Sequence, residues 1–134
     1  MIGVVEASAL VRLFVPDGPL PDGFEEFLRG VERGMNKAIA PELLVAEMAN
    51  VIVKKRKRGE LRDDESVVLL SDLLSVPVRL LPHSPILSKA FELAWEHNLT
   101  VYDTLYLALA EERGAVLFTA DDRLLKVAER LNLA

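Results

Sequence analysis

The chain has 134 residues, of which 28% are charged and 51% are hydrophobic, and its formal net charge is −5. It contains no cysteine and only two histidines, which excludes disulfides, a thiol nucleophile, a cysteine-ligated zinc site and a three-histidine metal site. The length predicts one domain over residues 1–134, and the apolar fraction argues against intrinsic disorder. The mildly acidic net charge argues against a protein that binds nucleic acid by charge alone.

The first half of the chain alternates short apolar runs with stretches of helical spacing. Ile2–Val5 is a β-branched run that stops at Glu6, which predicts a buried parallel strand. A repeated Pro-Asp-Gly in residues 15–24 predicts a mobile surface loop. Helices are expected at 7–14, 24–31 and 42–58, a second strand is expected at 38–40, and Pro41 is expected at the first position of the third helix.

The second half continues the alternation. Helices are expected at 61–75, from Ser84 onward, and from Thr100 to Gly114, and an outer strand is expected at 76–81 because Pro77 interrupts it. A last strand is expected at 115–118, before a helix capped by Asp121 or Thr119. The helix after Ser84 carries its apolar residues on one face: Leu87, Ala90, Phe91, Ala94 and Trp95. This order predicts an α/β fold, a three-layer α/β/α sandwich around a short, mostly parallel sheet.

Two acids follow predicted strands. Glu6 ends the first strand, and Asp121 follows the strand at 115–118. Ligand sites of open α/β sheets form outside the carboxyl ends of the strands. Each acid also has a structural interpretation, since Glu6 can simply mark the end of a strand and Asp121 can cap the last helix. Thr119 and Asp122 offer a competing capping box there.

Two further acids interrupt apolar helices. Glu47 lies in LLVAEMANVIV, where Asn50 is the only other polar residue, so this helix is expected to be buried nearly all round. A buried carboxylate must be neutral, paired with an arginine or bound to a cation. Asp103, in TVYDTLYLALA, either completes a capping box with Thr100 or holds an ion at the sheet edge.

Taken together, the acids predict a metal site. The strand ends and the helices that enter from the same edge bring Glu6, Glu47, Asp103 and Asp121 toward one another. Carboxylates gathered in this way raise one another's pKa, and a hard cation such as Mg²⁺ or Mn²⁺ relieves their repulsion. The pattern is typical of metal-dependent phosphoryl transfer.

The segments VVEASAL, PELLVAEMANVI and VYDTLYLALAEERGAVLFTADDRLL resemble the PIN-domain ribonucleases, in particular the VapC-type toxins of toxin–antitoxin pairs. The resemblance covers essentially the whole chain in length and element order. It implies an endoribonuclease that uses Mg²⁺ or Mn²⁺, forms a homodimer and is blocked by a small antitoxin protein. Carried over by motif, the acids are Glu6, Glu47, Asp103 and Asp121, with Ser8, Thr119 and Asp122 in supporting roles.

One residue departs from the family pattern. The family's first acid is almost always aspartate, whereas this chain has Glu6. The extra methylene displaces the carboxylate, so the alternative is a catalytically impaired PIN-like module that binds RNA or protein. A receiver-type phosphotransfer domain, which needs an aspartate ending a central strand and a lysine ending a later one, lacks its residues here.

The expected reaction is hydrolysis of an RNA phosphodiester by a metal-activated water. Glu6, Asp103 and Asp121 are expected to hold the ion, and Glu47 to bind a second ion or take the water's proton. Lys54 and Arg58, the ends of a run of five basic residues, are expected to contact RNA phosphates, unless the run only complements a helix dipole.

Aromatic residues and partners complete the expectations. Tyr102, Tyr106 and Trp95 either stack RNA bases or, as their helical spacing favours, pack in a core or interface. Helices apolar on most faces are hard to bury in one small domain, which favours a self-complementary surface and a homodimer. No apolar run suits a membrane span or a secretory signal, so a cytoplasmic protein is expected.

Overall fold

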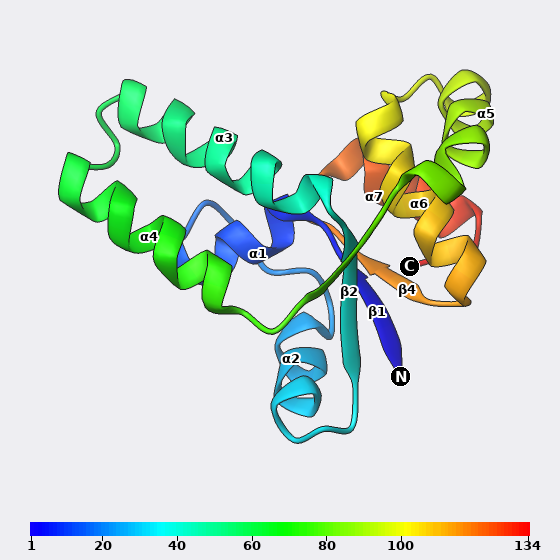
Figure 1. Cartoon of the computed structure of the whole chain (residues 1–134), viewed down its shortest axis with the longest axis horizontal. Coiled ribbons are helices and arrows are strands. Elements are labelled where there is room, and N and C mark those ends of the chain that lie inside the picture. The colour runs from blue at the N-terminus through cyan, green and yellow to red at the C-terminus, as the bar shows by residue number, and fades with distance from the viewer.

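The computed structural model describes residues 1–134 and centres on a four-stranded parallel sheet (Figure 1). The strands are β1 (Ile2–Val5), β2 (Lys37–Pro41), β3 (Arg79–Leu81) and β4 (Val116–Phe118), in the spatial order β3-β2-β1-β4. Val4 of β1 pairs with Ile39 on one side and with Leu117 on the other. Because every pairing is parallel, the carboxyl ends of all the strands meet at one edge of the sheet.

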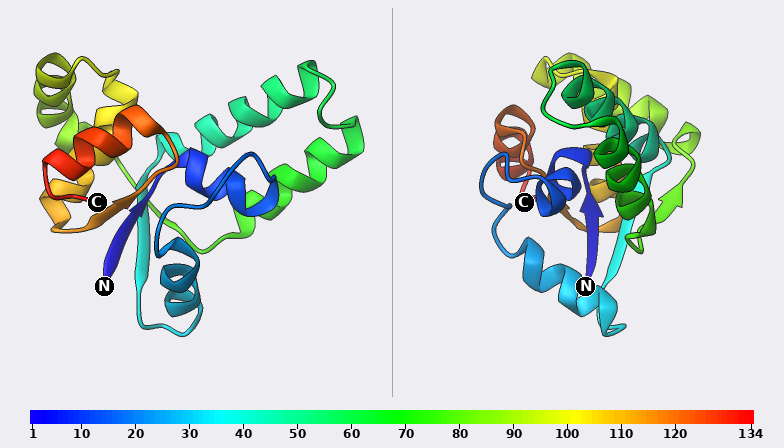
Figure 2. Two further views of the ribbon diagram at one scale, coloured as in Figure 1. Left: turned by 180° about the vertical axis from the view of Figure 1, so that it is seen from behind. Right: turned by 90° about the vertical axis from the view of Figure 1, so that its left-hand side faces the viewer.

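Helices cover both faces of this sheet, which confirms the predicted α/β/α layering (Figure 2). They are α1 (Ala7–Phe14), α2 (Phe24–Glu32), α3 (Leu43–Lys57), α4 (Asp63–Ser75), α5 (Leu87–His97), α6 (Val101–Arg113) and α7 (Asp122–Arg130), with a 3₁₀ turn, η1, at Ser84–Ile86. The helix α6 packs on β1, β2 and β4. On the other face, the rings of Phe24 and Phe27 from α2 lie 5.3 and 4.7 Å from that of Phe118. None of the helices combines the length and the apolar character that crossing a bilayer requires.

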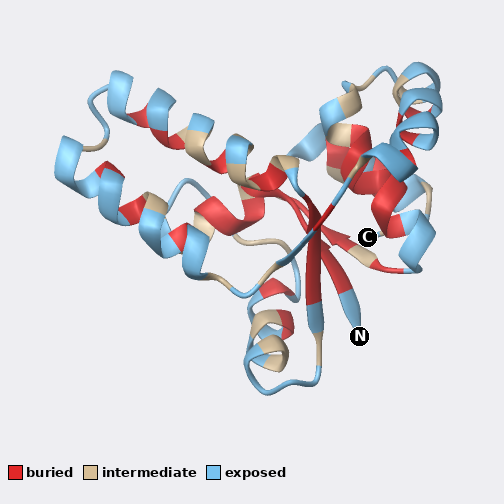
Figure 3. Cartoon of the chain, viewed as in Figure 1, coloured by how far each residue is buried: buried red, intermediate tan, exposed pale blue.

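The helices α3 and α4 pack side by side and project beyond the sheet as an arm (Figure 1). Figure 3 shows buried residues along their facing sides and exposed residues on their outer sides. Leu44, Met48 and Ile52 are buried, whereas Val53 is 45% exposed. The expectation that α3 is buried nearly all round is therefore wrong, because the helix runs past the sheet and finds packing partners on one side only.

Some local boundaries also differ from those expected. Pro41 is the last residue of β2 rather than the first of a helix, since the Glu42 N–H donates to Leu81 O at 2.9 Å and α3 begins at Leu43. The outer strand begins only at Arg79, after Pro77, which has no N–H to donate to a ladder. The helix expected from Ser84 opens as the 3₁₀ turn.

The apolar face of α5 is not the one the spacing suggested. Ala90 and Leu93 are buried, and α5 packs on α6. Leu87, Phe91 and Trp95 are 44%, 63% and 85% exposed. Leu87, Phe91 and Trp95 therefore lie on the protein surface, whereas Ala90 and Leu93 form the buried side of the helix.

An ion pair ties the loop between α1 and α2 to α3. Lys55 is only 6% exposed, and its ammonium group donates a hydrogen bond to the carboxylate of Asp17 in the first Pro-Asp-Gly. The Arg12 guanidinium donates to Pro19 O at 2.9 Å in the same loop. The loop expected to be mobile is thus anchored to α3 and to α1.

The Lys55–Asp17 pair predicts an asymmetry between two substitutions. Asp17→Asn leaves a buried ammonium group without its counter-charge and is expected to lower the free energy of unfolding by about 2 kcal/mol, less than for a fully buried pair because Asp17 is half exposed. Lys55→Met keeps an apolar stem in place and is expected to cost under about 1 kcal/mol. Urea denaturation measures both. Asp64→Asn, in an exposed pair with Arg62, is the control, and an equal loss at Asp17 and Asp64 would contradict the burial of Lys55.

Candidate active site at the carboxyl edge of the sheet

Glu6 lies directly after β1, at the carboxyl edge of the sheet. Its N–H donates to Phe118 O at 3.0 Å and so continues the pairing of β1 with β4. Its carboxylate caps α1 by accepting the Ser8 N–H at 3.1 Å, and it also accepts the hydroxyls of Ser8 and, at 2.8 Å, Thr119. The side chain thus ends a strand and starts a helix, as the structural interpretation holds, and is still placed where a ligand site is expected.

The two hydroxyls that hold Glu6 are themselves held by backbone amides. Ser8 Oγ accepts the N–H of Ala120 at 2.9 Å, and Thr119 Oγ1 accepts the N–H of Asp121 at 3.1 Å. Each hydroxyl therefore has its proton free to donate to the carboxylate. The network joins the start of α1 to the segment after β4, which carries Asp121.

Glu47 is half buried in the first part of α3 and has a tyrosine, not an arginine, as its partner. The Tyr106 hydroxyl donates to Glu47 Oε1 at 2.5 Å, and Tyr106 itself is fully buried. Burial and the nearby Glu47 carboxylate raise the pKa of Tyr106 far above its usual range, so its hydroxyl stays protonated as a donor. The residue packs in the core, and its position three residues after Asp103, on the same face of α6, was the available signal that it reaches the acids.

Asp103 and Asp121 lie at the N-terminal ends of two helices. Asp103 is half buried, and its N–H donates to the Thr100 hydroxyl at 3.1 Å, which is one half of the predicted capping box. Burial raises the pKa of the Asp103 carboxyl, and a hydrogen bond from the Thr100 side chain to the carboxylate offsets this rise in part. Asp121 is exposed and caps α7, accepting the Leu124 N–H at 3.0 Å. Asp122, the first residue of α7, is exposed and lines a separate cavity.

The electrostatic coupling runs from acid to acid across the edge. Burial raises the pKa of the Glu6 carboxyl to about 7, with the charge of Glu47 adding to the rise and the hydroxyl donors opposing it. Burial and Asp103 raise the pKa of Glu47, while burial and Asp121 raise that of Asp103. The four acids thus lie within electrostatic reach of their neighbours, in the order Glu6, Glu47, Asp103, Asp121. In this conformation no three histidine, aspartate or glutamate side chains are close enough together to hold an ion.

The basic run at the end of α3 is divided by the helix. Lys55 is buried against Asp17, and Arg56 donates to Asp63 at 2.8 Å. Arg58 lies 3.9 Å from Glu60 and remains exposed. Lys54 and Lys57 are exposed without an acidic partner. The run is therefore not one continuous patch, and Lys54 and Arg58 remain accessible in it.

The aromatic residues are divided in the same way. Tyr106 is buried, so the packing interpretation is right for it. Tyr102 is 63% exposed beside Asp103, and Trp95 is the most exposed large apolar residue of α5. Neither packs in the core of this chain.

The raised pKa of Glu6 predicts how stability depends on pH. Between pH 4.5, the ordinary value, and about 7, the folded protein keeps a proton on Glu6 that the unfolded chain has lost. Without metal ions, the free energy of unfolding is therefore expected to fall by about 3 kcal/mol as pH rises through this window. Glu6→Gln is expected to remove most of this dependence, as measured by urea denaturation in EDTA. Glu92→Gln, on α5, is the control, and an unaltered dependence in Glu6→Gln would contradict the burial of a titrating carboxyl.

The comparisons with known proteins identify the family of the chain. The PIN domain profile matches residues 3–130. Ribonuclease VapC3 of Pyrobaculum aerophilum is 39% identical over 126 residues, which are 90% of this chain and 90% of that protein.

Solved structures share the fold. PAE2754 from Pyrobaculum aerophilum superposes with a TM-score of 0.70 and 26% identity, over 94% of this chain and 84% of that one. The structure of VapBC2 from Rickettsia felis was solved with a bound DNA fragment from the VapBC2 promoter. It superposes with a TM-score of 0.61 and 19% identity, over 87% of this chain and 86% of that one. The chain therefore belongs to the PIN-domain family, among the ribonucleases of the VapC type.

Proposed function

We propose that the chain is the toxin of a toxin–antitoxin pair, a metal-dependent endoribonuclease that cleaves RNA at the edge where Glu6, Glu47, Asp103 and Asp121 meet. The observation that carries the proposal is the coupling of these acids, each of which raises the pKa of the next at the carboxyl ends of parallel strands. The membership in the VapC ribonucleases supports the same reaction.

The donor atoms of the site fit Mg²⁺ or Mn²⁺, which prefer carboxylate and other oxygen ligands. Glu6, Asp103 and Asp121 would hold the ion, and Ser8 and Thr119 keep Glu6 in place. When bound, the ion lowers the pKa of a water molecule and stabilises charge on the phosphate. Asp103 and Asp121 lie at helix N-termini, Asp121 on the exposed rim, so their side chains would turn inward to reach the ion.

Glu47 is placed to take the proton of the attacking water. Burial raises its pKa, which suits a general base, and the Tyr106 hydroxyl fixes one carboxylate oxygen while the other stays available. Hydrolysis by water leaves a 5′-phosphate and a 3′-hydroxyl and forms no covalent intermediate. Asp121, whose charge acts on Asp103, is the fourth acid rather than Asp122.

The partners follow from the surface and the family. Leu87, Phe91 and Trp95 form an exposed apolar stripe on α5, which supports a homodimer. The likeness to VapBC2 supports a cognate antitoxin. We place the activity in the cytoplasm, where its RNA substrate is found.

Asp103→Asn is expected to abolish cleavage. The substitution keeps the size of the side chain but removes a charge that holds the ion, so the rate is expected to fall by at least a hundredfold, about 3 kcal/mol of transition-state stabilisation. End-labelled RNA incubated with purified protein and Mn²⁺ measures the rate and identifies the product ends.

Asp72→Asn, on the arm and outside the acid site, is the matched control and is expected to cleave like the wild type. Equal cleavage by the Asp103→Asn variant and the wild type would contradict the assignment of the active site. If the wild-type protein binds RNA but does not cut it, the chain is the catalytically impaired module instead. The observation that favours this alternative is that the hydroxyls of Ser8 and Thr119 already occupy the Glu6 carboxylate.

Lys54 and Arg58 are proposed to contact RNA phosphates beside the acid site. Lys54 lies about 10 Å along α3 from Glu47, within the span of two nucleotides. Replacing both with glutamine is expected to weaken RNA binding and to reduce the slope of log K against log salt by about 0.7 for each phosphate that the protein no longer neutralises. Fluorescence anisotropy over a salt series measures the slope. The control is the double variant Lys126→Gln with Arg130→Gln, an equally spaced pair on α7, which is expected to keep the wild-type slope. If the Lys54 and Arg58 double variant also keeps the wild-type slope, these residues do not contact RNA phosphates.

A further inference from the structure

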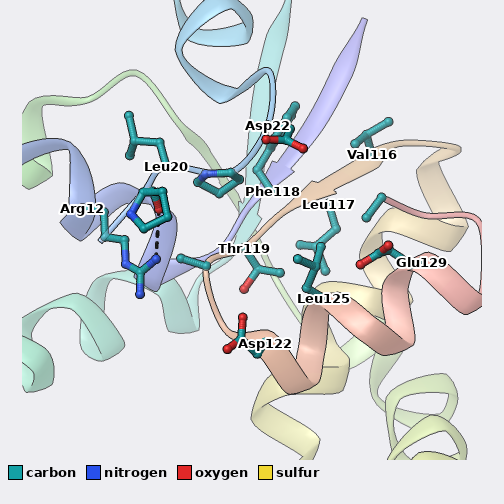
Figure 4. A pocket seen from close by; sticks show the side chains of 14 residues that line it. Arg12, Leu20, Asp22, Val116, Leu117, Phe118, Thr119, Asp122, Leu125 and Glu129 are labelled. Carbon is teal, nitrogen blue, oxygen red and sulfur yellow. Dashed lines mark hydrogen bonds between the residues drawn. The ribbon is translucent and has the colours of Figure 1, made fainter. Parts of the chain in front are cut away.

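A cavity of about 410 Å³ lies next to the acid site and plays no part in the chemistry above (Figure 4). Its walls come from α1, the Pro-Asp-Gly loop, β4 with the segment that follows, and α7. Thr119, which donates to Glu6 at 2.8 Å, also lines the cavity, so the two sites share a wall. Any RNA cleaved at the acids passes close to this opening.

The walls of the cavity are held in place by contacts within the chain. The Arg12 guanidinium donates to Pro19 O at 2.9 Å, and it lies so close to Gly18 that a Cβ there would be 3.1 Å from Arg12 Cζ. Asp17, at the start of the same loop, is paired with the buried Lys55. The loop is therefore fastened on both the α1 side and the α3 side, and the cavity is largely preformed.

The lining combines apolar walls with a few polar groups. Leu20, Leu117 and Leu125 supply apolar surface. The charged side chains are the guanidinium of Arg12 and three carboxylates, those of Asp22, Asp122 and Glu129. Figure 4 shows Arg12 on the α1 side of the cavity, with Leu125 on the α7 side. Excess negative charge disfavours a phosphate group here. A planar, largely apolar ligand that offers both donors and acceptors suits the lining, and the volume is that of a small-molecule site.

Guanine is the nucleobase that matches these groups. Its N1–H and N2–H donors lie side by side and suit one carboxylate, and its O6 and N7 acceptors suit a guanidinium. Adenine, cytosine and uracil each offer only one donor group on the corresponding edge. Proteins read single-stranded RNA by taking unstacked bases into such pockets.

We propose that this cavity is a guanine-specific subsite, in which Asp22 accepts the N1–H and N2–H of an unstacked guanine beside the cleaved bond and Arg12 donates to its O6 or N7. The inference rests on the proposed ribonuclease function, because only a bound RNA brings a base to the Thr119 wall. It makes the Pro-Asp-Gly loop a determinant of sequence specificity.

The test uses unstructured oligoribonucleotides in which a single guanine occupies each position around the cut in turn. At one fixed position, replacing guanine by inosine, which lacks the N2 amino group, is expected to lower kcat/KM of the wild type about tenfold, the effect of one charge-assisted hydrogen bond. Asp22→Asn is expected to shrink this ratio to about twofold or less. Asp72→Asn is the matched control and is expected to keep the wild-type ratio.

Binding of the same oligonucleotides to the metal-free protein, followed by anisotropy, provides a readout that needs no cleavage. Wild-type protein that cuts RNA and accepts inosine at every position overturns the guanine subsite and leaves the ribonuclease intact. Wild-type protein that cuts no RNA with Mn²⁺ refutes the proposed function. In that case the binding data test the subsite. Weaker binding of the inosine oligonucleotide to the wild type, with the difference lost in Asp22→Asn, supports the subsite, and equal binding of the two oligonucleotides to the wild type contradicts it.

Discussion

A carboxylate kept out of water at the end of the central strand is the constraint around which the catalytic edge is arranged. Glu6 is 8% exposed, and the three hydrogen bonds that it accepts lower the free energy of its charged form. They do not cancel the loss of hydration, since its pKa stays near 7. Ionisation of Glu6 is therefore unfavourable at neutral pH, and the cation proposed for this site would relieve that cost. The two bonds from Ser8 lie within the β1–α1 junction, and the bond from Thr119 joins this junction to the segment after β4, so the charge and the local architecture depend on each other.

The arm formed by α3 and α4 connects this edge to the rest of the molecule. The first turns of α3 lie near the sheet and present Glu47 to Tyr106. The later turns leave the sheet, expose Lys54 and fasten the Pro-Asp-Gly loop through Lys55. One helix therefore carries an acid of the candidate site, the exposed cation of Lys54 and the anchor of the loop that walls the adjacent cavity. A displacement of the arm changes all of them together.

The sequence allowed the sheet to be predicted, and with it the position of Glu6 and Asp121 at one edge, because both follow from local patterns. Short β-branched runs marked the strands, and parallel topology then placed Glu6 and Asp121 at one edge. The burial of α3 and the packing face of α5 were predicted wrongly, because apolar composition does not reveal whether a helix lies on the sheet or projects past it. The pairings of Glu47 with Tyr106 and of Asp17 with Lys55 join residues far apart in the chain, so each partner depends on tertiary geometry. The spacing of Tyr106 from Asp103 indicated the face of α6 on which Tyr106 lies but not that Glu47 is its partner. The cavity, built from four separate segments, was invisible for the same reason.

The charge distribution indicates which RNA the site accepts. The chain carries a net charge of −5, and the acids of the site and the carboxylates of the cavity lie close together. A rigid duplex, held mainly through its phosphates, meets this negative surface with few cations to offset it. In the proposed mode of binding, a flexible strand would instead place one phosphate at the acids, where an ion would offset the repulsion, and turn a base into the cavity past Thr119. Affinity then depends on base contacts more than on backbone charge, so a net-acidic protein can bind RNA and still discriminate among sequences.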